Sequence, residues 1–198
     1  MILLSNAKDS IENNNFSSWI LKQEIKDKRL PFIFIDETGT EIYKGVRRKF
    51  DLINRVFVNT NWGENVATIR RKYWAIKVTY ALLIGDKRIA LLKRTFDLTR
   101  ISFTINELGL RLIGETDERQ VKKAGYGRKR SQILETRYSE YKFRLLDSDD
   151  NVIMEFYPDL ETDENCFFIK VYDKEKELIC LCLVLAVYLE IDEMNRPD

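Results

Sequence analysis

The segment LICLCLVLAVYL, residues Leu178–Leu189, constrains the fold most, because it holds twelve residues without a charge, a glycine or a proline. As a helix it would reach only about 18 Å, which is short of the roughly 30 Å of a bilayer's hydrocarbon core. As a strand it would be apolar on both faces and would need a sheet covered on both sides. A helix that is apolar all round must be buried all round. The segment is therefore predicted to be a helix at the centre of the core.

Helix start signals precede this segment. Asp173 is a plausible N-cap, and Glu175 and Glu177 would place negative charge in the first turn, where the helix dipole favours it. The predicted helix covers about residues 174–192, with Leu183 and Leu185 inaccessible to solvent. A closed antiparallel β-barrel wrapped around the helix would bury it on every side.

The rest of the chain reads as short β-strands, because β-branched and aromatic residues recur in brief runs between turn signals. Gly85-Asp86 follows ALLI as a two-residue, glycine-first hairpin turn. Closure into a barrel would remove the exposed edges of such a meander. We predict a mainly β fold with about twelve strands: Phe16–Ile25, Phe32–Asp36, Glu41–Lys49, Arg55–Asn59, Val66–Tyr73, Lys77–Ile84, Lys87–Thr95, Ile101–Ile105, Leu110–Gly114, Ile133–Leu146, Val152–Tyr157 and Cys166–Tyr172.

A sequence repeat runs through this meander. The stretches RRKFDLINR, RRKYWAIKV and KRTFDLTRI align on Phe50, Tyr73 and Phe96, which are 23 residues apart each time. A unit of this length accommodates two strands and two short connections. The three copies are therefore expected to occupy equivalent places in consecutive hairpins, with the three aromatic residues at one end of the barrel.

The length of 198 residues fits one domain. We expect residues 1–15 to form a flexible N-terminal segment and residues 16–193 to form the barrel domain. The N-terminus lacks the basic start of a signal peptide. Three cysteines at apolar positions, Cys166, Cys180 and Cys182, form no CxxC pair and are expected to be buried thiols of a cytoplasmic protein.

The chain contains no histidine, which removes the commonest general base and the commonest metal ligand. The acidic and basic residues show no pairing by spacing that would suggest catalysis, so a non-enzymatic protein without a cofactor is expected. Charge is uneven: residues 147–198 hold fifteen Asp or Glu and four Lys or Arg, although the whole chain carries a net charge of +1. Two explanations stay open, namely basic strands packing beside acidic ones and a surface that binds anions.

The predicted barrel around a hydrophobic helix resembles the tubby C-terminal-like superfamily, which includes the tubby proteins, the phospholipid scramblases and the LURP-one-related proteins. The resemblance rests on FIFIDETGTEIYKGVRRKF, on the repeated meander and on CFFIKVYDKEKELICLCLVLAVYLEID, and it spans roughly residues 16 to 193. It implies a twelve-stranded barrel. Tubby domains bind phosphoinositide headgroups, scramblases respond to calcium, and the LURP-one-related branch has no clear biochemical activity.

Calcium binding is disfavoured by the residues themselves. The acidic run DLETDEN lies where scramblases carry an acidic segment, but it has no glycine for the sharp turn of a calcium loop, and a solvated loop explains it. No metal site is expected. Nucleic acid is likewise a disfavoured partner, because the overall charge is near zero and aromatic residues in strands usually serve packing.

Two basic groups are candidate phosphate-binding sites. The first is a ridge from the repeats, with Arg48, Arg71 and Arg94 on one face and Arg47, Arg70 and Lys93 on the opposite face. The second is the glycine-containing loop RQVKKAGYGRKR, which could also be a solvated excursion without a ligand. Its candidate residues are Lys122, Lys123, Arg128, Lys129 and Arg130.

The expected function is a non-enzymatic binding or scaffold module. The favoured ligand is an anionic phosphate group, such as a phosphoinositide or another membrane headgroup. A scaffold that binds protein partners without a small ligand is the alternative. The protein would then be cytoplasmic, either free or peripheral at the membrane, without a transmembrane span.

Overall fold

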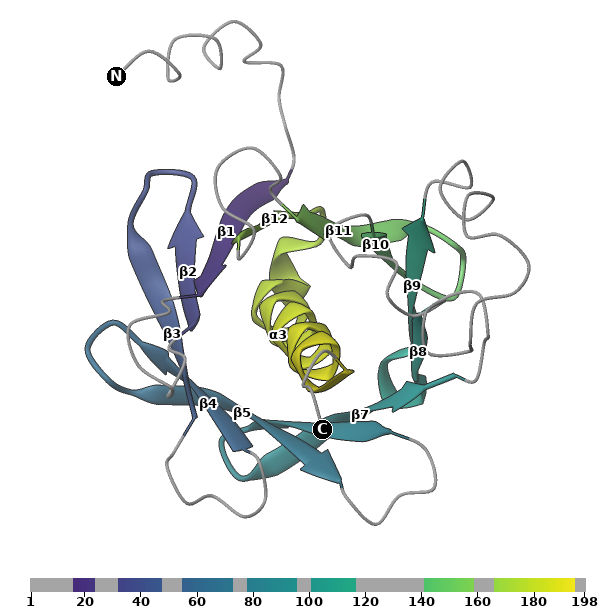
Figure 1. Cartoon of the computed structure of the whole chain (residues 1–198), viewed down its shortest axis with the longest axis horizontal. Helices are drawn as coiled ribbons and strands as arrows, with labels where there is room; N and C mark the ends of the chain where they lie inside the picture. The colour runs from purple at the N-terminus through teal and green to yellow at the C-terminus, as the bar shows by residue number, and fades with distance from the viewer. Residues whose placement is uncertain are drawn as a thin grey trace, which may run out of the picture.

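The computed structural model describes residues 16–23, 32–47, 55–72, 78–95, 101–116, 141–158 and 166–194, without the side chains of residues 192–194. Within these residues, twelve antiparallel strands close into one barrel around a long helix (Figure 1). The strands are β1 (Ser17–Gln23), β2 (Phe32–Asp36), β3 (Glu41–Arg47), β4 (Arg55–Thr60), β5 (Asn65–Lys72), β6 (Thr79–Ile84), β7 (Lys87–Arg94), β8 (Ser102–Ile105), β9 (Leu110–Thr116), β10 (Tyr141–Leu146), β11 (Val152–Pro158) and β12 (Cys166–Val171).

Each strand pairs with its neighbours in sequence, and β1 pairs with β12 to complete the ring. The predicted fold class is therefore confirmed. The predicted and observed strand ends agree to within two residues wherever the structure describes them. Closure leaves none of the twelve described strands with an unpaired edge, which removes a route to edge-to-edge association.

The helix α3 (Glu177–Met194) follows the short 3-10 turn η3 (Lys174–Lys176). Asp173 caps this start as predicted, because its carboxylate accepts a hydrogen bond of 3.1 Å from the Glu175 backbone N–H. Every residue from Cys180 to Val187 is buried, and Leu183 and Leu185 are at most 1% exposed. The prediction that the helix itself forms the centre of the core is confirmed.

Alternate residues of each strand point inward onto this helix. The largest fully buried side chains are five phenylalanines on the inner wall, Phe32, Phe34, Phe103, Phe143 and Phe156. Phe143 and Phe156 stack with ring centroids 4.6 Å apart. The cysteines are free and buried, as expected from the sequence.

The up-and-down topology divides the connections between two ends of the barrel. We call one end the turn end, because short turns there join β2 to β3, β4 to β5 and β6 to β7. The helix α3 also begins at this end. Gly85 and Asp86 form the predicted two-residue turn, with φ +57° at Gly85. At the other end, called the Glu190 end, lie the last residues of β3, β5, β7 and β9, and the segments 24–31, 48–54, 73–77, 96–100, 117–140 and 159–165 that join strands there lie outside the described residues.

The described residues of the second and third repeat copies occupy equivalent positions on their strands. Ile69 on β5 and Leu92 on β7 are both buried on the inner wall, with Arg71 and Arg94 two residues further along the same face. The first copy is shifted by one residue, because Gly45 faces α3: a Cβ on it would lie 3.0 Å from Leu185 Cδ2. By strand alternation, Arg47 then lies on the inner face, which corrects its predicted placement with Arg70 and Lys93.

Phe50, Tyr73 and Phe96, the aromatic residues that define the repeat, lie outside the described residues. Their expected position at one end of the barrel therefore stays a prediction. The strands that precede them, β3, β5 and β7, all run toward the Glu190 end.

Candidate functional site

Charge is segregated along the barrel axis. At the turn end the described carboxylates outnumber the basic residues, whereas basic residues dominate the strand termini of the Glu190 end. The carboxylates of the turn end are Asp36, Glu37, Glu41, Glu64, Asp86, Glu107, Asp147, Asp149, Asp150, Asp173, Glu175 and Glu177, and the basic residues there are Lys87, Arg88, Arg111, Lys170, Lys174 and Lys176. The basic residues of the Glu190 end are Lys22, Arg47, Arg55, Arg70, Arg71, Lys72, Lys93, Arg94 and Lys142, and the described carboxylates there are Glu115 and Glu190.

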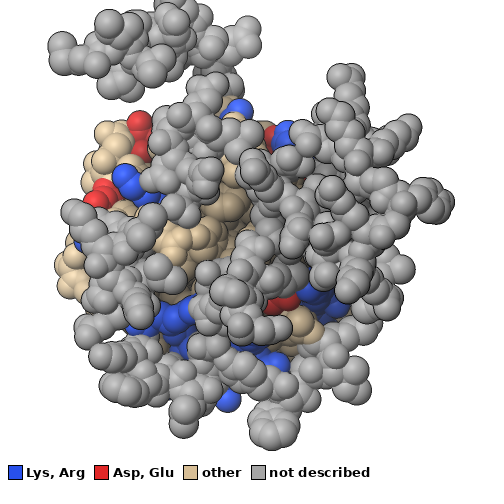
Figure 2. Space-filling model, viewed as in Figure 1, with Lys and Arg blue, Asp and Glu red and all other residues tan. Residues whose placement is uncertain are grey.

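The basic residues gather on one side of the barrel. Viewed down the barrel, Lys and Arg side chains concentrate over the part of the face where β4, β5 and β7 lie (Figure 2). Odd-numbered strands end here and even-numbered strands begin here, so basic residues that are far apart in the sequence share one rim.

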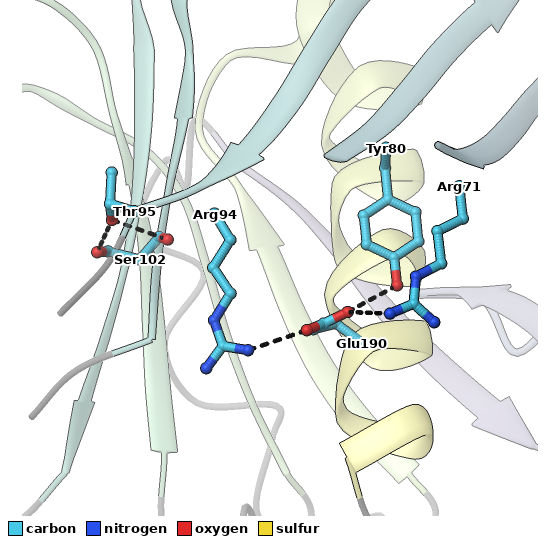
Figure 3. Close-up of polar contacts among 6 residues, drawn as sticks. All are labelled: Arg71, Tyr80, Arg94, Thr95, Ser102 and Glu190. Atoms are coloured by element: carbon cyan, nitrogen blue, oxygen red, sulfur yellow. Dashed lines mark hydrogen bonds and ion pairs between the residues drawn. The ribbon is translucent and has the colours of Figure 1, made fainter. Parts of the chain in front are cut away.

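Inside this rim, the helix contributes a buried carboxylate. Glu190 is 2% exposed and faces three side chains of the barrel wall (Figure 3). Arg94 Nη1 donates to Glu190 Oε1 at 3.0 Å, and Tyr80 Oη donates to Oε2 at 3.0 Å. Arg71 Nη2 forms an ion pair with the same Oε2 at 3.9 Å. A buried carboxylate is tolerated only when it is paired and hydrogen-bonded in this way.

This inner cluster brings together two predicted site residues, Arg71 and Arg94. Their side chains are only 21% and 25% exposed, and both form ion pairs with Glu190. The sequence grouped the two arginines correctly through the repeat but did not predict their partner. One feature of the sequence could have predicted this partner. Glu190 is the first charged residue after the apolar segment Leu178–Leu189, so a buried helix would place it against the barrel wall, where it needs a cationic partner.

On the outer side of the same strands lies a second basic group. We call Arg55, Arg70, Lys72 and Lys93 the outer basic patch. Arg55 pairs directly with Arg70 between β4 and β5, and Thr79 on β6 lies between Lys72 and Lys93. The patch therefore spans four adjacent strands, which are about 4.8 Å apart. Its cationic groups are rooted within roughly 15 Å of one another.

Exposure and pairing distinguish the outer basic patch from the inner cluster. Arg70, Lys72 and Lys93 are exposed, and within the described part of the chain no carboxylate lies within ion-pair distance of these three. Arg55 is half-buried, with its guanidinium 5.6 Å from the centroid of the Phe57 ring. Like charges directly opposite each other on a sheet destabilise it slightly. An anion bound between them would relieve this repulsion.

A further carboxylate fixes the start of α3 at the turn end. Glu177 accepts hydrogen bonds from Ser17 Oγ and, at 3.2 Å, from Trp19 Nε1, both on β1. Burial, with a further contribution from the Glu177 charge, raises the pKa of the Tyr43 hydroxyl above its usual value. The helix is thus tied to the wall by one carboxylate at each end.

The remaining candidate residues lie outside the described residues. These are Arg48, the loop residues Lys122, Lys123, Arg128, Lys129 and Arg130, and the acidic run Asp159–Glu164. Within the residues that the structure does describe, no group of three Cys, Asp or Glu side chains could hold a metal ion. Burial raises the pKa of the Cys180 and Cys182 thiols to about 12.

Comparisons with known proteins identify the fold. No family model matches the chain, and no curated protein matches it in sequence. The X-ray structure of a LURP-one-related protein from Arabidopsis thaliana is similar, with a TM-score of 0.53 and 12% sequence identity over 91% of this chain and 92% of that one. This likeness shows a shared barrel fold. None of the helices in the described parts of the chain has both the length and the apolar character needed to cross a membrane.

Proposed function

We propose that this protein is a non-enzymatic, tubby-like barrel of the LURP-one-related type that binds anionic phosphate groups at its Glu190 end. The favoured ligand is a phosphoinositide or another phosphorylated headgroup, which the protein would meet as a cytoplasmic or peripheral membrane protein. The observation that carries the proposal is the outer basic patch, in which half-buried Arg55 and exposed Arg70, Lys72 and Lys93 lie on strands β4, β5 and β7 at the basic end of the barrel.

Phosphate chemistry suits the outer basic patch better than the inner cluster. Arginine offers a planar fork for two phosphate oxygens, and lysine offers a compact charge. Arg71 and Arg94 already neutralise Glu190, so a ligand there would have to displace a buried carboxylate. Arg70, Lys72 and Lys93 are exposed and have no such competitor among the described residues.

The topology also connects the predicted loop site to the same end. The segment with Lys122, Lys123, Arg128, Lys129 and Arg130 joins Thr116, the last residue of β9, to Tyr141, the first of β10. Both attachment points lie at the Glu190 end, Thr116 two strands and Tyr141 three strands beyond β7. Because neighbouring strands are about 4.8 Å apart, these attachment points are roughly 10 and 14 Å from the patch. The loop and the outer basic patch could therefore serve one ligand surface.

The decisive experiment compares two variants with the same loss of charge. The patch variant is Arg70→Gln/Lys72→Gln/Lys93→Gln, and the control is Lys87→Gln/Arg88→Gln/Lys174→Gln at the turn end. Binding is measured by vesicle sedimentation with phosphatidylcholine vesicles containing either phosphatidylinositol bisphosphate or phosphatidylserine, and by calorimetry with soluble inositol hexakisphosphate. The first two probes test a membrane headgroup and the third tests a free phosphate ligand.

A basic residue near an anionic membrane surface contributes about 1 kcal/mol, so the patch variant should bind between about tenfold and a hundredfold more weakly. The control should change binding by less than about threefold, and binding of the wild type should weaken as salt is raised. A loop variant that neutralises the five residues of segment 117–140 measures that site separately. Wild-type protein that binds none of the probes at low salt, or a control that loses as much as the patch variant, would contradict the proposal.

A further inference from the structure

The β4–β5 hairpin presents an exposed tryptophan at the turn end. The side chain of Trp62 is 77% exposed, whereas Trp19 is buried in the core. Tryptophan is the residue most enriched at the energetic centres of protein interfaces, because one rigid ring covers a large apolar area. An exposed tryptophan side chain on a protein with a well-packed core is therefore a candidate docking residue.

The hairpin holds this ring in a defined position. Thr60 N–H donates to the Glu64 carbonyl at 2.8 Å, and Gly63 N–H donates to the Thr60 carbonyl at 3.0 Å. The Thr60 hydroxyl accepts from Glu64 N–H at 3.1 Å, and Asn61 N–H donates to the Ile42 carbonyl of β3 at 3.2 Å. Gly63 adopts φ +93°, a conformation that favours glycine. The turn is thus ordered by its own hydrogen bonds, and docking Trp62 would require little further ordering.

Carboxylates lie in the Trp62 turn itself and in the neighbouring β2–β3 turn, whereas the β6–β7 turn on the other side carries Asp86 with Lys87 and Arg88. Glu64 lies in the same turn, and Asp36, Glu37 and Glu41 lie at the adjacent β2–β3 turn; Glu41 is paired with Lys44 at 3.1 Å. A tryptophan face bordered by negative charge favours a cationic partner, since the ring attracts Lys and Arg through its π electrons. The same carboxylates would repel an anionic membrane surface.

The other end of the same barrel offers that cationic partner surface. We infer that the Trp62 hairpin of one molecule docks on the outer basic patch of a second copy of this chain. Arg70, Lys72 and Lys93 supply exposed cations without described carboxylate partners, and Trp62 and Glu64 supply the ring and the charge that complement them. Because the two surfaces lie at opposite ends of the barrel, the contact is head-to-tail.

Two consequences follow from the shared surface. Head-to-tail contacts do not close on themselves unless the rotation permits a ring, so association should continue beyond a dimer as concentration rises. A phosphorylated ligand at the outer basic patch would compete with Trp62 for the same cations, and ligand binding would release monomers. The self-association itself does not depend on the proposed phosphate binding.

Sedimentation velocity over a concentration series tests the contact. The full chain should associate at about 0.01 M salt, where the Debye length is about 30 Å, and dissociate at about 1 M salt, where it is about 3 Å. Trp62→Ala should weaken association at least about tenfold, and Trp62→Phe should retain most of it because the ring is kept. Lys87→Gln/Arg88→Gln, which makes the turn end more acidic, should preserve or strengthen association. All variants should keep the wild-type melting temperature, because Trp62 is exposed.

A mixing experiment separates this contact from any other mode of association. Trp62→Ala retains the outer basic patch, and Arg70→Gln/Lys72→Gln/Lys93→Gln retains Trp62, so each variant alone should be monomeric. Mixed at equal concentration, they should form a one-to-one dimer and nothing larger. Wild-type protein that stays monomeric at low salt, or a mixture that remains monomeric, would overturn the inference while leaving phosphate binding untouched. Vesicle binding that depends on Trp62 in a protein that does not self-associate would also overturn it and assign the ring to a membrane.

Discussion

Arg94 on β7 and Glu190 on α3 are 96 positions apart in the chain and form a hydrogen-bonded ion pair of 3.0 Å inside the barrel. The pair attaches the end of the central helix to the wall that surrounds it. Tyr80 and Arg71 complete the coordination of the same carboxylate. The two arginines thereby hold the helix in place, whereas the outer basic patch is the surface proposed above to bind a ligand.

The first prediction concerns Glu190. Glu190→Gln keeps the side-chain shape and one acceptor oxygen but removes the negative charge that Arg71 and Arg94 contact. Hydrogen bonds to charged groups contribute about 1.5–3 kcal/mol each, so we expect a loss of about 2 kcal/mol in the free energy of unfolding. For a chain of this length that lowers the melting temperature by roughly 4–8 °C. Glu64→Gln, in the exposed β4–β5 turn, is the matched control, and equal losses in the two variants would refute the role of the inner cluster.

The second prediction concerns Gly45. A Cβ at this position would lie 3.0 Å from Leu185 Cδ2 and 3.2 Å from Phe32 Cβ, closer than ordinary van der Waals contact. Gly45→Ala should therefore destabilise the protein by about 1–3 kcal/mol through overpacking, measured by urea unfolding. Combining it with Leu185→Val, which makes room beside the new methyl group, should cost at least about 0.5 kcal/mol less than the sum of the single changes. Strict additivity would show that helix and wall do not meet at this point.

The third prediction concerns the thiols. Cys166, Cys180 and Cys182 are buried, and burial raises the pKa of Cys180 and Cys182 to about 12. Because the thiolate is the reactive form, native protein at pH 8 should not react with an aromatic disulfide reagent over minutes. All three thiols should react at once after denaturation in guanidinium chloride. Rapid reaction of one thiol in the native protein would show that the barrel opens around the helix.

The fourth prediction concerns acid stability. The pKa values of Asp36, Asp147 and Asp173 are lowered from 3.8 by side-chain hydrogen bonds, chiefly from Thr38, Asn151 and Lys176 respectively. A lowered pKa means that the ionised form stabilises the fold. This contribution is complete above pH 3.8 and is lost as the pH falls through the lower native values.

The melting temperature of the wild type should therefore fall below about pH 4, and the triple variant Asp36→Asn/Asp147→Asn/Asp173→Asn should start lower at pH 7 and fall less steeply. Glu37→Gln/Asp86→Asn/Asp149→Asn removes the same number of charges from the turn end and serves as the control. If the control flattens the acid transition as much as the triple variant, the side-chain hydrogen bonds of Asp36, Asp147 and Asp173 are not its cause.

The sequence by itself determined the barrel and its central helix. A helix that is apolar on every side must be buried on every side. The alternation of apolar and polar residues along a strand can be read from residues that are close together in the sequence. The Asp173 cap and the Gly85-Asp86 turn were predictable for the same reason, because each depends on two or three consecutive residues. Burial of Leu183 and Leu185 followed from the helix.

Only the tertiary structure decided which charges meet. The inward position of Gly45 shifted the first repeat by one residue, and that shift placed Arg47 on the face opposite to the one that the sequence spacing predicted. The pairing of Glu190 with Arg94 and Arg71, and the alignment of Arg55 with Arg70, depend on strand register and on closure of the ring. Electrostatic contacts act over a few ångströms in space, so residues that are remote in sequence acquire partners only when the barrel closes.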